Sequence, residues 1–214
     1  MANMINADKL REFRSHYPDA AVVCYVNSTA EVKAESDICC TSSNAVKVVR
    51  SLGKRRILFV PDRNLAAFVH SRTGADIVPW DGFCIVHERM CPDDVERARA
   101  AHPNALLLVH PECPPPVVAL ADGVESTAGM VRFVKESKTR EFIIGTEMGL
   151  IEQLRDSYPQ KTFHALTESA VCANMKLTDL AKLAWALDHE QWEITVPEEI
   201  RAKAYHALER MVHL

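Results

Sequence analysis

Two cysteines, Cys84 and Cys172, hold the positions in this chain where thiolate chemistry is most strongly indicated. Each ends one of two similar stretches, from His16 to Cys84 and from His102 to Cys172. Landmarks in the two stretches recur about 85 positions apart, which indicates two copies of one structural unit. Because tandem copies pack around a shared axis, equivalent end positions converge in space. Two converging thiolates predict a metal or iron–sulfur cluster site at that axis.

Polar side chains end the first apolar stretch of strand length in each copy. Tyr25 and Asn27 stand there in the first copy, and His110 and Glu112 stand at the equivalent positions in the second. In parallel sheets covered by helices, ligands bind beyond the carboxyl ends of the strands. These four side chains are therefore candidate ligand contacts, although an ordinary turn is the simpler explanation of His110 and Glu112 from the sequence alone.

Hydroxyl side chains precede a helical pattern in both copies, at Ser42 and at the pair Ser126 and Thr127. The first turn of a helix offers free backbone N–H groups and the positive end of the helix dipole, which favour a phosphate or a carboxylate. The alternative for these residues is a plain N-cap without a ligand.

The elements that must position these side chains alternate between strands and helices. The strands are fully apolar, which is typical of parallel strands buried on both faces. The expected strands are residues 21–26, 37–41, 56–61, 76–80, 105–110, 141–145 and 161–164, and the expected helices are residues 3–16, 30–34, 45–52, 64–71, 116–121, 149–158 and one beginning at Met130. The pattern predicts an α/β fold of two tandem, pseudo-symmetric three-layer αβα units with short parallel sheets.

The repeat ends after Cys172. Residues 177–187 and 197–214 have the pattern of amphipathic helices, with a short strand expected at 194–196 between them. The predicted organisation is a first unit at 1–88, a second at 89–174 and a helical tail at 175–214. Since the tail has no counterpart core in the repeat, we expect it to pack outside the two units.

Composition excludes several classes of protein. With 214 residues, 48% of them hydrophobic, the chain can bury two compact cores. The formal net charge of -4 argues against a nucleic-acid-binding surface, and no apolar run is long enough for a membrane span. The seven cysteines, an odd number without a secretion signal, favour a reducing cytoplasm over a disulfide framework.

Several longer strings resemble one enzyme family, and together they run in order along essentially the whole chain. They are YVNSTAEVKAESDICCTSSNAVKVV, FVPDRNLA, WDGFCIVHE, HPECPPPVVALAD, ESTAGM, FIIGTEMGL, CANMKLTDLAKLAWAL and VPEEI. On these strings the chain is identified as a member of the quinolinate synthases, bacterial enzymes of de novo NAD biosynthesis. The resemblance implies three pseudo-symmetric αβα domains around a central [4Fe–4S] cluster, two of which this chain would supply.

That resemblance assigns the cysteines. Cys84 and Cys172 are implied to be two of three thiolate ligands of the cluster, and the other five cysteines are interpreted as structural. Three thiolates leave one iron open, and an open iron is a Lewis acid that can bind a substrate oxygen. The family's N-terminal domain, with the first cluster cysteine, is expected to be missing before Met1, and the tail would normally pack on it. The isolated chain is therefore expected to be inactive or nearly so.

The resemblance also implies roles around the open iron. Six side chains are implied to contact the substrates: Tyr25, Asn27, Ser42, His110, Glu112 and Thr127. Ser42 and Thr127 would bind carboxylates or phosphate. Glu112 is the candidate general base, because removing a proton next to a carbonyl needs a carboxylate within hydrogen-bond reach. His110 could orient an oxygen or carry a proton, and Tyr25 could move a second proton.

Four neighbours of these residues have less certain roles. His87 would support the cluster ligand beside it. Lys176 could lie near the cluster, although a solvated helix lysine is the simpler interpretation. Glu125 and Ala128 stand where the family more often has glycine. A carboxylate at position 125 would repel a bound anion unless its side chain points to solvent.

The implied reaction is a transferase reaction that condenses iminoaspartate with dihydroxyacetone phosphate to quinolinate, with loss of phosphate and water. L-Aspartate oxidase is the implied source of iminoaspartate, and no nucleic-acid or membrane partner is expected. Two alternatives remain from other classes. One is a non-catalytic two-domain relative that folds or binds a cluster, and the other is a zinc-dependent hydrolase that uses His87, His110 and Glu112.

Overall fold

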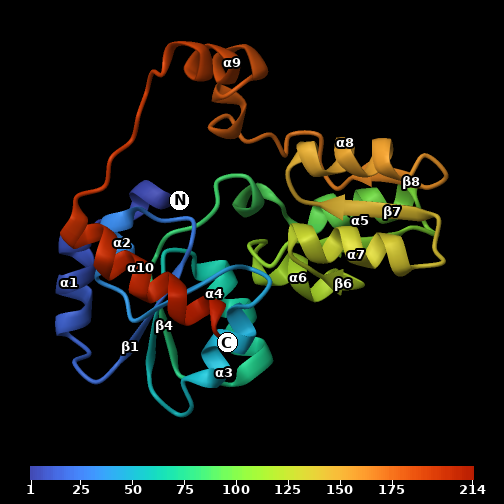
Figure 1. Cartoon of the computed structure of the whole chain (residues 1–214). Helices are drawn as coiled ribbons and strands as arrows, with labels where there is room; N and C mark the ends of the chain where they lie inside the picture. Colours follow the sequence, from blue (N-terminus) through green and yellow to red (C-terminus); the bar gives the residue numbers. More distant parts are fainter.

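The computed structural model describes residues 1–214, and it contains two units with the same strand topology (Figure 1). The first sheet consists of β1 (Ala21–Tyr25), β2 (Ile38–Cys40), β3 (Ile57–Val60) and β4 (Ile77–Pro79), and the second of β5 (Leu106–Val109), β6 (Gly123–Val124), β7 (Glu141–Gly145) and β8 (Thr162–Ala165). The strand orders are β2-β1-β3-β4 and β6-β5-β7-β8, and every pair is parallel. The α/β prediction is confirmed.

Helices cover both faces of each sheet. In the first unit α3 (Ala45–Ser51) and α4 (Arg63–Thr73) cover one face, while α1 (Ala7–Ser15) and α2 (Ala30–Ala34) cover the other. In the second unit α5 (Pro92–Ala101) and α6 (Pro115–Leu120) lie on one face, and α7 (Thr127–Glu136) and α8 (Met148–Ser157) lie on the other. Three short 3-10 helices, at Ala2–Met4, His87–Arg89 and Met175–Leu177, complete the secondary structure before the tail. Each unit is thus the three-layer αβα arrangement that the apolar strands predict.

The alternation of side chains along the strands divides each core into two halves. Cys39 packs into the half under α1 and α2, and its neighbour Cys40 packs into the half under α3 and α4. Both are fully buried, as is Cys24, which pairs in register with Cys39. Successive residues of a strand point to opposite faces, so this adjacent pair fills core space on two sides rather than converging on one ligand.

The register of the two sheets gives an offset of 85 residues between corresponding positions. Ile57 pairs with Ala21 in the first sheet, and Phe142 pairs with Leu106 in the second. The same offset makes Asp62 equivalent to Glu147, and both residues are N-caps, of α4 and α8. Thr146, the residue before Glu147, is therefore equivalent to Pro61 and not to Asp62.

One α-helix and one strand lie in segments where no element was expected, and several bounds differ. Helix α5 was missed because its sequence, PDDVERARAA, is mostly polar, although a proline at its first position and two aspartates in its first turn are helix-start signals. Strand β6 has only two residues, too few to show a period. The helix expected to begin at Met130 begins at Thr127, and the helix expected at 3–16 begins at Ala7.

The two tail helices behave differently. Helix α10 (Glu198–Val212) packs along α2 and β2 of the first unit, where Ala204 and Ala207 are buried. The expectation that the tail finds no packing partner in the two units is therefore wrong for α10. Small residues on this face let the helix approach the unit closely, and Met211 adds a partly buried contact to both halves of the core.

Helix α9 (Leu180–His189) stands away from both units in Figure 1, joined to α10 by an extended segment. Its apolar side chains face solvent, and Leu180 is 84% exposed. The strand expected at 194–196 is absent, and Ile194 there is 88% exposed. A β-prone triplet forms no strand without a neighbouring strand to pair with. Packing of α9 on a further domain stays a prediction.

The two units meet along α4, which contacts α6. The Asn64 side chain joins them, because its Nδ2 donates to the backbone oxygen of Glu112 at 3.1 Å and to Glu88 Oε2 at 2.7 Å. No helix of the structure has both the length and the apolar character needed to cross a membrane.

Candidate functional site

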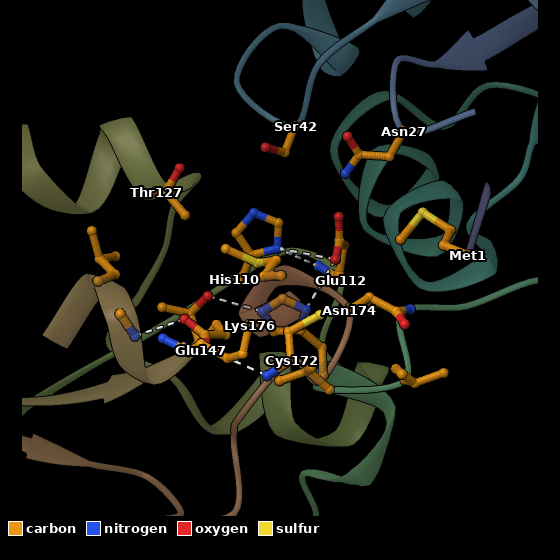
Figure 2. Close-up of a pocket in the computed structure, with 18 of the residues that line it drawn as sticks. Met1, Asn27, Ser42, His110, Glu112, Thr127, Glu147, Cys172, Asn174 and Lys176 are labelled. Carbon is orange, nitrogen blue, oxygen red and sulfur yellow. Dashed lines mark hydrogen bonds and ion pairs between the residues drawn. The ribbon is translucent and has the colours of Figure 1, made fainter. Parts of the chain in front are cut away.

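A cavity of about 830 Å³ lies between the two units and the start of the tail (Figure 2). All eight residues that the sequence nominates as ligand contacts or thiolate ligands line it: Tyr25, Asn27, Ser42, Cys84, His110, Glu112, Thr127 and Cys172. Figure 2 shows Asn27 and Ser42 on one side, Thr127 on another, and His110 and Glu112 between them. Ligand pockets typically measure roughly 300–1,000 Å³, so the cavity is large enough for a small organic substrate together with a cofactor.

The first unit contributes side chains from the carboxyl ends of its two neighbouring strands. Tyr25 is the last residue of β1, Asn27 follows two residues later, and Ser42 follows β2. Tyr25 is buried, and burial together with the nearby charge of Glu112 raises the pKa of its hydroxyl well above the ordinary value. Its hydroxyl therefore stays protonated and is a potential hydrogen-bond donor at the cavity wall.

The second unit contributes the buried pair His110 and Glu112 from the carboxyl end of β5. The backbone N–H of His110 donates to Gly145 at 3.0 Å, which continues the ladder between β5 and β7 by one residue. The backbone N–H of Glu112 then donates to His110 Nδ1 at 3.3 Å. His110 and Glu112 are 4% and 3% exposed. These two hydrogen bonds fix the turn after β5, so both side chains are held at the cavity wall.

His87 links this pair to the rest of the site. Its Nδ1 lies 2.9 Å from Glu112 Oε2, an ion-pair contact with poor hydrogen-bond alignment, and its Nε2 lies 2.9 Å from Thr146 Oγ1. Its ring also stacks on that of His110, with centroids 4.7 Å apart and planes 20° apart. His87 is buried, and it lies between the two units in sequence and in space.

The buried charges decide the protonation states. Burial favours the neutral forms of both Glu112 and His87, but contact with His87 lowers the pKa of Glu112, and contacts with Cys84 and Glu112 raise the pKa of His87. Burial lowers the pKa of His110 to about 4, since Glu112 offsets only part of the desolvation and charged His87 adds to it. At neutral pH the group is therefore an ionised Glu112, a cationic His87 and a neutral His110.

Cys84 and Cys172 are free, partly buried, and the only two of the seven cysteines that line the cavity. Cys84 Sγ, a ring nitrogen of His87 and a carboxylate oxygen of Glu112 all lie within 4.8 Å of one another. Cys172 is positioned by a different contact: its backbone N–H donates a hydrogen bond to Glu147 Oε1 at 3.3 Å. Two thiols from different units at one cavity are soft ligands, and this donor type fits the chemistry of an iron–sulfur cluster.

Among the cavity-lining residues that were not nominated from the sequence, Thr146 and Glu147 make contacts to the site's named groups. Thr146 contacts His87, and Glu147 caps α8, accepts from Cys172 and lies 3.6 Å from Lys176 Nζ. Both follow β7, at the carboxyl edge where His110 follows β5. Their position after an apolar strand is the signal that could have found them. Lys176 lines the cavity and is half-exposed, so it is not simply a solvated lysine.

Of the three nominated hydroxyl residues, only Ser126 is an N-cap. The N-cap of α3 is Asn44, whose Oδ1 accepts from Thr41 N at 2.7 Å, so Ser42 precedes the cap. In the second unit the cap is Ser126, which accepts from Gly129 N at 3.1 Å, and Thr127 is the first helical residue. Ser42 and Thr127 are thereby free of capping bonds and line the cavity.

Glu125 does not line the cavity. Its carboxylate folds back against Gly129 in the first turn of α7, where a side chain on residue 129 would collide with it. The repulsion expected between this carboxylate and an anion in the cavity is thus reduced by its orientation.

Comparison with known proteins identifies one family. The family described as quinolinate synthetase A protein matches residues 1–213. A quinolinate synthase of Methanoregula boonei is 52% identical over 214 residues, which are 100% of this chain and 71% of that protein. One of Dehalococcoides mccartyi is 53% identical over 212 residues, 99% of this chain and 70% of the relative. One of Alkaliphilus metalliredigens is 50% identical over an alignment of 215 residues, which covers 100% of this chain and 71% of the relative.

Proposed function

Because the chain belongs to the quinolinate synthetase A family, we propose that its cavity is where iminoaspartate and dihydroxyacetone phosphate are condensed to quinolinate. Family membership supports a role in NAD biosynthesis. The observation that carries the site is the convergence of side chains from both units on one cavity, with an ionised carboxylate, a neutral imidazole and two thiols on its walls.

Cys84 and Cys172 would hold a [4Fe–4S] cluster together with a third thiolate from outside residues 1–214. When bound, such a cluster supplies a Lewis-acidic iron that can polarise a substrate oxygen. The fit rests on the two free cysteines at the cavity wall. None of the other five cysteines lines it.

The protein's own groups would bind the substrates and move their protons. Glu112, held ionised by His87, accepts a proton at a carboxylate oxygen. Protonated Tyr25, whose hydroxyl lies close to Glu112, can donate a hydrogen bond, and Asn27 offers an amide at the same cavity. The hydroxyls of Ser42 and Thr127, free of capping bonds, would hold the substrates' carboxylates or phosphate. Iminoaspartate, which L-aspartate oxidase would supply, is protected from hydrolysis when the cavity excludes water.

The site's chemistry favours this function over a zinc hydrolase. The close group contains Cys84 with His87 and Glu112, whereas the hydrolase hypothesis needs His110 in the same group. His110 Nδ1 is 3.9 Å from Glu112 Oε2, and His110 is not part of the close group of ligand atoms.

Anaerobic reconstitution of the purified chain tests the proposal, with bound iron, acid-labile sulfide and quinolinate formation as readouts. We expect iron and sulfide bound through the two cavity cysteines, with little or no turnover by residues 1–214 alone. Turnover at a normal rate would contradict the expectation that the chain alone is inactive while supporting the assigned reaction. Zinc bound through the cavity cysteines, without iron or sulfide, would overturn the cluster and the proposed function.

A further inference from the structure

A second group of ligating side chains lies at the opposite edge of the second sheet. His102 precedes β5, Glu141 is the first residue of β7, and His164 lies in β8. Their ligand atoms, two imidazole nitrogens and one carboxylate oxygen, all lie within 4.8 Å of one another. None of the three lines the cavity, which adjoins the carboxyl ends of the strands, so this group is a separate site.

We propose that His102, Glu141 and His164 form a binding site for a divalent transition-metal ion of the zinc type. Two imidazoles and a carboxylate are a donor set that suits such an ion, with water in the remaining position. The side chains are 31%, 36% and 24% exposed, so an ion and its water can reach them.

The distances agree with that donor set. Glu141 Oε1 lies 3.1 Å from His164 Nε2 and 3.6 Å from His102 Nδ1. Ligands about 2.0–2.1 Å from a tetrahedral zinc ion are about 3.3 Å from one another, midway between these two separations. The two imidazoles are stacked, with centroids 3.4 Å apart and planes 12° apart, so the rings must tilt to point both nitrogens at one ion.

The backbone explains why the three side chains share one face. Phe142 and Phe163 pair in register and stack on the α7 and α8 face of the sheet. Alternation along the strands therefore sends Glu141 and His164 to the α5 face, where His102 ends that helix. No lysine or arginine pairs with Glu141, so the two imidazoles are its only ion-pairing partners.

The first unit supplies an internal comparison at the same place in the repeat. The 85-residue offset makes Tyr17 and Arg56 equivalent to His102 and Glu141, and the pairing of β4 and β8 with their neighbouring strands makes Val78 equivalent to His164. There the Arg56 guanidinium lies over the Tyr17 ring at 5.8 Å and pairs with Asp76, and none of the three is a metal ligand. Since the same fold forms without ligating residues at this edge, packing alone does not require the histidine pair.

Zinc titration of the full chain tests the site, with cobalt as a spectroscopic probe. Cobalt bound to a thiolate gives a charge-transfer band that cobalt bound by imidazole and carboxylate lacks, so the cavity cysteines are distinguishable from this site. Near-isosteric Glu141→Gln is the principal variant and His164→Gln the second. The control is His213→Gln, because His213 is an exposed histidine outside the group. The apo-protein melting temperature of each variant checks folding.

We expect one zinc ion per chain without thiolate ligation, and a zinc-dependent rise in melting temperature. Removing even an outer partner of a metal ligand costs about 10- to 100-fold in affinity, so loss of a ligand should weaken zinc binding at least tenfold. The control should bind as the unchanged chain does. Equal affinity in all four proteins, or zinc bound only with the thiolate band, would overturn the proposal. If His164→Gln does not fold, Glu141→Gln decides the outcome.

Discussion

The two αβα units have the same strand order and the same register, but the carboxyl ends of their strands have different chemistry. The first unit presents Tyr25 and Asn27, which are neutral hydrogen-bonding groups. The second presents His110 and Glu112, which can exchange protons. The duplicated backbone therefore determines where side chains converge, and a few substitutions on it determine what the cavity can do.

The opposite edges of the two sheets differ in the same way. A cation over an aromatic ring, Arg56 on Tyr17, occupies the first unit, and two stacked imidazoles on Glu141 occupy the second. At both ends of the strands, the first unit has side chains that pack, form hydrogen bonds or form ion pairs. The second unit has side chains that can bind a metal or exchange a proton. The second unit thus carries more of the ionisable chemistry.

The largest effect is expected when a cavity cysteine is removed, since each unit supplies one of the two. Cys84→Ala and Cys172→Ala should each reduce cluster-bound iron and sulfide to background, because a cluster held by so few thiolates cannot lose another. Iron and sulfide analysis after reconstitution measures this. Cys91→Ala, at an exposed cysteine outside the cavity, is the matched control and should retain both. Full iron content in Cys84→Ala would contradict the assignment of that ligand.

Glu112→Gln makes the second unit resemble the first by replacing its carboxylate with an amide like that of Asn27. Removing one partner of a buried ion pair typically costs about 3–5 kcal/mol, because the other charge is left uncompensated. We expect that loss in the free energy of unfolding of the cluster-free protein, measured by urea denaturation at neutral pH. Asn27→Ser should cost far less, since no buried charge depends on Asn27. Equal losses would show that His87 is not a cation balanced by Glu112.

Leu58→Ala and Ile143→Ala compare the two cores at corresponding, fully buried positions of β3 and β7. Each should lower the free energy of unfolding by about 2–5 kcal/mol, from lost burial plus the cavity left behind. Hydrogen exchange shows whether each loss is confined to its own unit. We expect the losses to be shared, because Asn64 and α4 join the units. Loss of protection in one unit only would show that they unfold independently.

The smallest effect on folding is expected in α9. Leu180→Glu changes a side chain that is 84% exposed, so the free energy of unfolding should change by less than about 0.5 kcal/mol. Its effect should appear in association instead, because exposed apolar patches promote self-association. Light scattering should show weaker self-association than in the unchanged chain. Lys182→Gln, on the same helix, serves as the control. A monodisperse monomer before any substitution would contradict this prediction.

Much of the fold and of the candidate site could be predicted from local patterns. Apolar strands such as 21–26 and 56–61 appear within one or two residues of their expected bounds, because hydrophobic runs bounded by turn residues are short-range signals. The cavity residues were found because they follow those strands, where ligands of parallel sheets bind. Helix α5 and strand β6 were missed, since a polar helix and a two-residue strand carry little periodic signal.

By itself the sequence determined the two-unit α/β architecture and the residue types that meet at its centre, because repeats and strand ends are local properties. Only the tertiary structure decided that His87 bridges Glu112 and Thr146, that α10 packs on the first unit while α9 does not, and that His102, Glu141 and His164 gather at one edge. These contacts join residues more than 20 positions apart in the sequence. Their existence depends on strand register and helix packing, which no local pattern specifies.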